Sequence, residues 1–424
     1  MNRRTLLCTL GLSGALAGCV APFAPAGGGE TAASGADSVA PMPPTTAPLG
    51  YTHVGADGNR VVDGTGSLPD TGPVDVTLAA RPEWVVGVPH DDGVLLGVVT
   101  RAGTQAVSVG TEEAEAVDID LGTVRGPPLL IGGSDPQFAP RLGSETTHPV
   151  PTAGGWVFVA TDGVVNLPRG TRADVGALPD ARIAAAAGRL YVLATRTRAY
   201  AHGVLGDEFE ARSVAGLNPG GEVERTLDAP SGVIEGIAPI VADIDGDGER
   251  EVIVTTSDAE EGARVVALSA SGEARQGPPI GTGFRWRHQL AAAPFGPDGE
   301  VEVAVVKTPH IGGTAEFYRA REGRLDLVAS LRGYSTHAIG SRNLDNAVAG
   351  DFDGDGQVEL LVPDDPQRHL AGLRRVDGGD SDGVEEAWRL PLDGTLTSNV
   401  SAVSVQDGIV VAAGTEDSLR VWPA

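Results

Sequence analysis

The segment "ADIDGDGEREVIV", residues 242–254, joins an acidic, glycine-rich turn to a run of β-branched residues. Asp243, Asp245 and Asp247 stand at positions 1, 3 and 5 of the turn, and the two intervening glycines supply the positive φ angles that a tight turn needs. Because alternate side chains of such a turn point inward, three carboxylates would surround one hard cation. The segment therefore predicts a calcium-binding turn between two β-strands.

The pattern occurs three times in the chain. The stretch 347–362, "AVAGDFDGDGQVELLV", repeats it fully, whereas 291–306, "AAAPFGPDGEVEVAVV", has Pro294 and Gly296 in place of the first two aspartates. We expect two structural Ca²⁺ sites and no ion at the middle copy. The expected ligands are Asp243, Asp245, Asp247, Glu249 and Glu251 in the first site and Asp351, Asp353, Asp355, Gln357 and Glu359 in the second, where position 7 contributes its backbone carbonyl. The alternative is an acidic turn whose aspartates only cap backbone amides.

The place of the glutamate separates this loop from an EF-hand. An EF-hand has a bidentate glutamate at position 12 and helices on both sides, but Val254 and Val362 stand at position 12 here, within predicted strands. An acidic residue at position 9 between two strands resembles the FG-GAP or VCBS repeat, which is the blade unit of integrin-α-like β-propellers. The Gly-Ala-Pro of that repeat is replaced by "TTSD" and "PDDP". The resemblance implies a propeller in which calcium, at the two complete loops, holds the turn between the first two strands of a blade.

The spacing of the copies predicts the architecture. They begin at Asp243, Pro294 and Asp351, a period of about 50 residues that leaves room for four strands, which is typical of a β-propeller blade. Weaker copies lie at 82–100, 154–167, 184–203 and 404–422. We therefore predict an all-β, seven-bladed β-propeller with four-stranded blades over 51–424, with six or eight blades as alternatives. The last blade lacks an outer strand, and we expect a segment near 51–64 to supply it and close the ring.

The start of the chain predicts export. A charged beginning, an apolar run over 6–16 and the "LAGC" that ends at Cys19 resemble a prokaryotic lipoprotein signal, so that 1–19 would be the signal and Cys19 the lipidated residue. The alternative is a buried N-terminal helix with an ordinary cysteine. The Ala-, Pro- and Gly-rich stretch 20–50 is expected to be a disordered linker. These features predict a lipid-anchored, extracytoplasmic protein of the cell membrane or outer membrane, exported by the Sec or the twin-arginine route.

The formal net charge of −26 argues against a nucleic-acid partner, because phosphate backbones are bound by clustered Lys and Arg. We expect a monomer that contacts membrane only through its lipid. Three histidines precede predicted inner strands, where they could line a ligand channel with three neighbouring residues. This set consists of His148, Arg285, Trp286, Arg287, His288 and His337. The alternative is that the histidines hydrogen bond to neighbouring blades.

No sequence motif of a hydrolase or of a phosphate-binding loop is present. We therefore expect a noncatalytic protein-interaction or adhesion scaffold whose protein or glycan partner the sequence does not name. A calcium-dependent lectin is the alternative, and a polysaccharide-active propeller enzyme is a third. The aromatic content of 4% leaves few rings on which sugars could stack, which weighs against a dedicated carbohydrate enzyme.

Overall fold

The computed structural model describes residues 46–52, 55, 57–200, 208–282, 285–338, 341, 343–377, 383–416 and 418–424. The expected signal peptide, Cys19 and most of the expected linker lie outside the described residues. All described strands belong to one compact unit, Met42–Ala424. Over the described ranges, no helix has the length and apolar character needed to cross a membrane.

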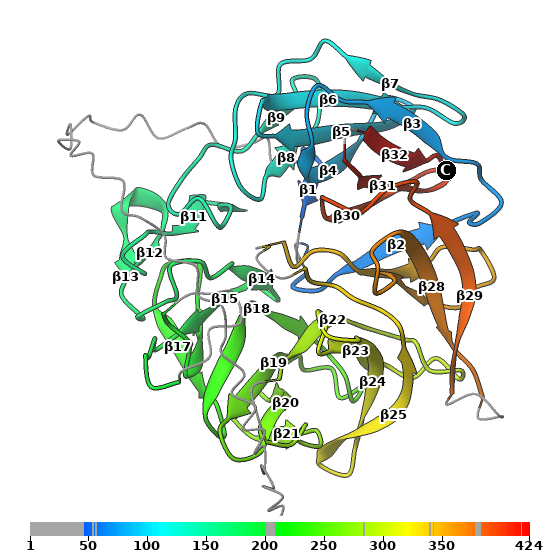
Figure 1. The fold of residues 1–424 in the computed structure, drawn as a ribbon. Coiled ribbons are helices and arrows are strands. Elements are labelled where there is room, and N and C mark those ends of the chain that lie inside the picture. Colours follow the sequence, from blue (N-terminus) through cyan, green and yellow to red (C-terminus); the bar gives the residue numbers. More distant parts are fainter. Residues whose placement is uncertain are drawn as a thin grey trace, which may run out of the picture. The chain divides into compact units, whose positions relative to one another are not determined.

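The described residues form eight β-sheets arranged as the blades of a β-propeller (Figure 1). Five of these sheets consist of four consecutive strands in sequence order. The first two are β4 (Pro82–His90), β5 (Gly93–Thr100), β6 (Gly103–Val109) and β7 (Ala114–Val117), and β10 (Val150–Thr152), β11 (Gly155–Val159), β12 (Val165–Asn166) and β13 (Arg172–Ala173), with the 3₁₀ turn η1 (Pro168–Gly170) between the last two strands. The next three are β14 (Ala184–Ala186), β15 (Arg189–Ala194), β16 (Ser213–Leu217) and β17 (Val223–Asp228); β18 (Val233–Ala242), β19 (Glu251–Asp258), β20 (Gly262–Leu268) and β21 (Ala274–Gln276); and β22 (Arg287–Ala293), β23 (Glu302–Lys307), β24 (Thr314–Arg321) and β25 (Arg324–Arg332).

The other three sheets each take one strand from the N-terminal part of the unit. Their orders are β1 (Leu49–Tyr51), β8 (Leu129–Ile131), β9 (Gln137–Phe138); β2 (Val61–Thr65), β26 (Val348–Asp351), β27 (Glu359–Pro363), β28 (His369–Arg375), β29 (Val384–Pro391); and β3 (Val74–Thr77), β32 (Ser418–Trp422), β31 (Gly408–Gly414), β30 (Val400–Val405). Strand β2 lies parallel to β26, whereas β1 and β3 pair antiparallel with β8 and β32. Pairing of β2 and β3 with strands from the C-terminal part of the chain thus closes the ring.

The all-β propeller with mostly four-stranded blades is confirmed, but the predicted number of seven blades is wrong, since there are eight. The blade that was not predicted is β1–β8–β9. Its strands are two or three residues long, and its first strand comes from a distant part of the chain. The strand that completes the last blade is β3, not a strand within 51–64. That segment holds β2 and the end of β1, which belong to two other blades.

Burial falls from the inner to the outer strand of a blade. Every residue of β18 and of β22 is buried, while β17 at the outer edge of its sheet is mostly exposed. The inner strands β18 and β22 are therefore buried on both faces and show no alternation of buried and exposed residues. Neighbouring blades share cores: Ile240 and Val265 of one sheet belong to the same buried cluster as Val303 and Tyr318 of the next.

The antiparallel order within a blade separates its loops into two groups. Loops between first and second strands lie at one end of a blade, as for 243–250 between β18 and β19 and 352–358 between β26 and β27. The loop between second and third strands lies at the opposite end, together with the connection that enters the blade. For the blade β22–β25 these are 308–313 and 277–286.

Candidate functional site

The first acidic loop is folded by contacts between its own aspartates and its backbone. Asp243 accepts hydrogen bonds from the amides of Gly246 (2.7 Å) and Gly248 (3.0 Å), and Asp247 accepts one from the amide of Glu249 (2.8 Å). Both glycines have positive φ angles, 77° and 88°. Capping of amides, the alternative to metal binding, is therefore present and accounts for the shape of the turn.

Three carboxylates of this loop come together at one point. Asp243, Asp245 and Glu251 each place one oxygen within 4.8 Å of the others, whereas Asp247 and Glu249 are exposed and do not join this group. Arg275 of β21 forms ion pairs with Asp245 and, at 3.1 Å, with Glu251. Burial and the neighbouring charge of Asp245 raise the pKa of Glu251, and Arg275 acts against this rise. A guanidinium group thus already lies against part of the first expected calcium site.

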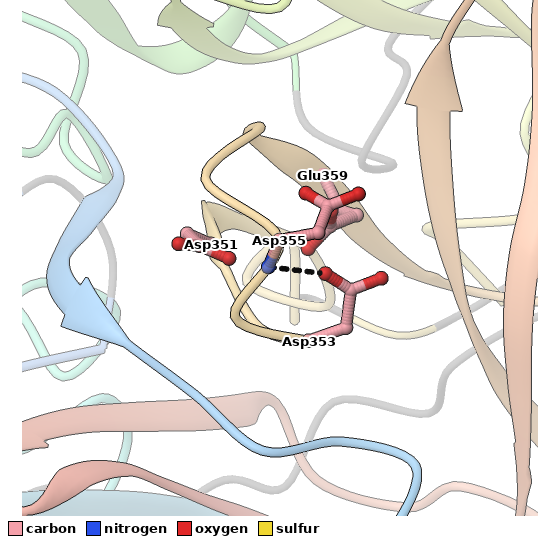
Figure 2. A group of neighbouring side chains, drawn as sticks. All are labelled: Asp351, Asp353, Asp355 and Glu359. Carbon is pink, nitrogen blue, oxygen red and sulfur yellow. Dashed lines mark hydrogen bonds between the residues drawn. The ribbon is translucent and has the colours of Figure 1, made fainter.

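The second loop gathers four carboxylates (Figure 2). Asp351, Asp353, Asp355 and Glu359 each place one oxygen within 4.8 Å of the others. The turn is closed by amide contacts like those of the first loop, including Asp355 N–H to Asp353 Oδ1 at 3.1 Å, drawn as the dashed line in Figure 2. Gln357 lies at position 7 and hydrogen bonds to Asp355, so its side chain does not join the group.

Glu359 is the residue whose charge the second loop leaves unbalanced. It has no exposed surface; its Oε2 accepts the amide of Phe352 at 2.8 Å, and its buried Oε1 has no hydrogen-bond partner among the described residues. Burial, with the repulsion of the three aspartates, raises the pKa of Glu359 to about 8. A buried carboxylate beside three others favours a cation, and an all-oxygen group of this kind suits a hard ion such as Ca²⁺. The residues therefore fit a cation at this loop.

The middle copy neutralises the corresponding glutamate differently. Glu302 is also fully buried, but it pairs with Arg319 of β24 (Nε to Oε1, 3.1 Å) and with Arg375 of the next blade (Nε to Oε2, 2.8 Å). Arg319 also pairs with Glu300 of the same loop. Two guanidinium groups supply at Glu302 the positive charge that the second loop lacks at Glu359.

The expected ligand channel is brought together only in part. The ring of Trp286 stacks on His288 with centroids 4.7 Å apart and meets His337 edge to face at 5.8 Å. Arg287 is buried and pairs with Glu316 at 2.9 Å, and Arg285 is exposed in the same segment. His148 lies apart, with its ring 5.8 Å from that of Tyr51.

The histidines of this set are held by hydrogen bonds within the fold. His288 Nδ1 lies 2.8 Å from Thr336 Oγ1, His337 Nε2 lies 2.8 Å from the carbonyl oxygen of Ser341, and His148 Nδ1 lies 3.1 Å from that of Pro149. Burial lowers the pKa of His337, which favours a neutral ring. The contact of His288 with Thr336 joins two separate segments, as the alternative interpretation expects. The contacts of His148 and His337 lie within their own segments.

Sequence reasoning did not identify the arginines that define the three loops. Arg275, Arg319 and Arg375 lie on strands outside the loops that they neutralise, and Arg375 reaches across from another blade. Arg374 pairs with Asp355 and with Glu385 in the second loop's own blade. An arginine on a later strand of each repeat is the signal that would have pointed to them.

No protein-family model and no curated protein matches the sequence. Solved structures resemble the chain at low identity. A candidate 6-phosphogluconolactonase from Bacteroides fragilis is 13% identical, with a TM-score of 0.37 over 88% of this chain and 90% of that one. The exotype rhamnogalacturonan lyase YesX is 14% identical, with a TM-score of 0.29 over 80% and 72%. A subtype N11 neuraminidase-like protein from a flat-faced bat isolate is 10% identical, with a TM-score of 0.31 over 86% and 97%. These similarities do not indicate an activity for this chain.

Proposed function

We propose that the protein is an exported, lipid-anchored β-propeller of the FG-GAP or VCBS type that binds Ca²⁺ at its two acidic loops and serves as a noncatalytic protein-interaction or adhesion scaffold. The lipid would be carried by Cys19, as the lipoprotein-like start of the chain implies. The propeller would then stand outside the cytoplasmic membrane and present its loops to partner proteins.

The observation that supports calcium is the group of four carboxylates with the unpartnered, buried Oε1 of Glu359. Glu359 can accept a backbone amide hydrogen bond without being charged, whereas binding of a cation requires its carboxylate form. The ion would hold the loop between the first two strands of a blade, and in this place it stabilises the fold. The first loop would bind calcium more weakly, because it gathers three carboxylates instead of four and Arg275 pairs with its buried glutamate, Glu251. In the second loop, Arg374 pairs with Asp353 and Asp355 and leaves the buried glutamate unpaired.

The ion pairs of a cavity beside the outer strand β25 support a noncatalytic role. This cavity of about 890 Å³ contains Glu300 and Asp326, each paired with an arginine of the same cavity, Arg319 and Arg324. Carboxylates in such pairs keep their charge and are poorly suited to the proton transfers that a glycosidase needs.

Calcium binding is tested by thermal and urea unfolding of the full chain with Ca²⁺ and with chelator. When the free Ca²⁺ concentration is ten times the dissociation constant, the ion is expected to add about 1.4 kcal/mol per site to the free energy of unfolding. Asp353→Asn with Glu359→Gln should abolish most of that gain. The matched control is Asp92→Asn, which removes one exposed carboxylate elsewhere. Equal unfolding with and without calcium, together with no bound metal by native mass spectrometry, would refute the calcium proposal.

The scaffold role is tested with a glycan array read with Ca²⁺ and with chelator, and with turnover assays on polysaccharides. We expect neither glycan binding nor turnover. Calcium-dependent glycan binding would show that the protein is a lectin and not a protein-interaction scaffold. Turnover of a polysaccharide would show that it is an enzyme.

A further inference from the structure

A second cavity lies at the end of the blade β22–β25 that is opposite to its acidic loop. Its volume is about 640 Å³, within the range of ligand sites in proteins. The connection that enters β22 supplies one wall with Pro278 and Arg285, and the loop after β23 supplies another with His310 and Ile311. Trp286 of the histidine stack lines this cavity together with Arg285 and Arg287, so three residues of the expected ligand channel meet here. The acidic loops do not contribute to its lining.

The cavity is positively charged in a strongly acidic protein. Arg285, Arg287 and Lys307 line it with a single carboxylate, Glu316, although the chain has a net charge of −26. Arg287 and Lys307 lie 2.9 and 2.6 Å from the two oxygens of Glu316, and the hydroxyl of Tyr318 donates to the same group at 2.6 Å. Glu316 is thus fully occupied, and the excess of positive charge remains for a ligand.

The rim of the cavity is apolar. Ile311 and Leu327 are 71% and 41% exposed, and they are two of the three large hydrophobic side chains exposed in the described part of the chain. Leu327 and Pro278 also line the 890 Å³ cavity, so that the two cavities share wall residues and offer room for an extended ligand. Large apolar side chains gathered at the surface mark interaction sites more often than single exposed ones do.

The lining favours a peptide over a sugar. Trp286 supplies the cavity's one six-membered aromatic ring, but it is only 1% exposed and one face is stacked on His288, so a sugar ring could not stack on it. Its indole N–H has no acceptor among the described residues. Aliphatic side chains beside carboxylates would fill the apolar rim and meet the cationic groups.

We propose that this cavity binds an acidic peptide segment of a partner protein, with aliphatic side chains against Ile311 and Leu327 and carboxylates at Arg285 and Lys307. The inference rests on the proposed scaffold role and names the chemistry of the partner. It does not rest on calcium, because the acidic loop of this blade lies at its other end.

The test uses the fact that Lys307 is the only lysine of the chain. The full chain is treated with an amine-acetylating reagent, and modification of Lys307 is followed by peptide mass spectrometry. The probe is an acetylated, amidated hexapeptide of alternating Leu and Glu, compared with the Leu-Gln and Ser-Glu hexapeptides and with oligogalacturonate. Binding is measured in parallel by fluorescence anisotropy of the labelled probes.

The Leu-Glu probe should protect Lys307, and the Leu-Gln and Ser-Glu probes should do so much less. Arg285→Gln and Ile311→Ser, both at exposed positions, should each weaken binding by about fivefold, the size expected from one surface contact. The matched controls Arg125→Gln and Val223→Ser change exposed residues elsewhere and should have no effect.

No protection by the Leu-Glu probe, equal binding by the Arg285 variant, or protection by oligogalacturonate alone would overturn the proposal. Repeating the assay in chelator separates the two proposals. Protection that persists without calcium supports the peptide site whatever becomes of the metal sites. Glycan binding or turnover in the assays described above would instead remove the scaffold role.

Discussion

The loops at 294–302 and 351–359 have the same frame and the same place in adjacent blades, but they balance a buried glutamate in different ways. Glu302 has two arginines, and Glu359 has none. The difference follows from the residues at positions 1 and 3. With Pro294 and Gly296 there, little draws an arginine toward the tip of the loop, and Arg319 pairs with the glutamates instead.

In the second loop, the arginine at the matching place is drawn away. Arg374 of β28 pairs with Asp355 and Glu385 and does not reach Glu359. Aspartates at the tip therefore do two things: they supply oxygens for a cation, and they remove the internal counterion of the glutamate. One repeat frame thus gives either an ion pair within the protein or a group of carboxylates that fits a cation, and the residues at positions 1 and 3 distinguish the two loops.

The largest effect is expected from breaking the protein-only pair. Glu302→Gln would leave the buried Arg375 without a counterion and Arg319 with Glu300 alone, at a cost of about 3–5 kcal/mol of unfolding free energy. Urea unfolding should show the same loss with Ca²⁺ and with chelator. Glu300→Gln, a more exposed partner of Arg319, should cost less than about 1 kcal/mol. If calcium restored the stability lost in Glu302→Gln, the loop at 294–302 would bind the ion and would not differ from the loop at 351–359 as described.

A smaller effect is expected from pH in the chelated protein. The folded-state pKa of Glu359, about 8, lies above its ordinary value of 4.5, so its protonated form stabilises the fold below pH 4.5 and this contribution is lost as the pH rises to 8. The slope is at most about 1.4 kcal/mol per pH unit. Unfolding at pH 5, 6.5 and 8 should show the chelated protein losing stability relative to Glu359→Gln, and calcium should abolish the difference. If the free energy of unfolding of the chelated protein and of Glu359→Gln changed with pH in the same way, the raised pKa of Glu359 would be contradicted.

The smallest effect is expected at the first loop, 243–251. This loop gathers carboxylates as the second loop does, but an arginine pairs with its buried glutamate as in the middle loop. Arg275→Gln removes the cation that competes for Asp245 and Glu251, so calcium affinity at that site should rise by about fivefold. Isothermal titration calorimetry on a Glu359→Gln background isolates the first site, and Arg125→Gln is the control for loss of an exposed charge. Unchanged or weaker affinity would show that Arg275 does not occupy the ion's place.

The sequence predicted the blade unit because strong turns and apolar strands repeat within about 50 residues. It did not predict the eighth blade, because β8 and β9 are too short to show a period and β1 comes from far upstream. The closing strand was expected near 51–64, but it lies at 74–77, because several short strands in the N-terminal part could have fitted the same gap. Which distant segments pair is decided only when the ring closes. The local pattern of apolar and polar residues carries no information about that closure.

At the candidate sites, the sequence predicted the acidic loops and their gathered carboxylates, because these lie within nine residues of one another. It did not predict which loops carry an internal counterion. Arg319 faces Glu302 only through the register of β23 and β24, and Arg375 does so only through the packing of two blades. The sequence placed Arg285, Trp286 and Arg287 in a ligand channel, and all three line the cavity at Lys307. It did not predict the other walls, because they come from separate loops and strands.

The three N-terminal strands also determine how the molecule would carry a mechanical load. A pull on the N-terminal segment meets β1, β2 and β3 in turn, and each is hydrogen-bonded into a different sheet. Detaching β1 or β2 leaves the last blade intact, because β3 still pairs with β32. A force on the N-terminal segment would therefore have to break the hydrogen bonds of β1 and then those of β2 before it reached β3, which completes the last blade.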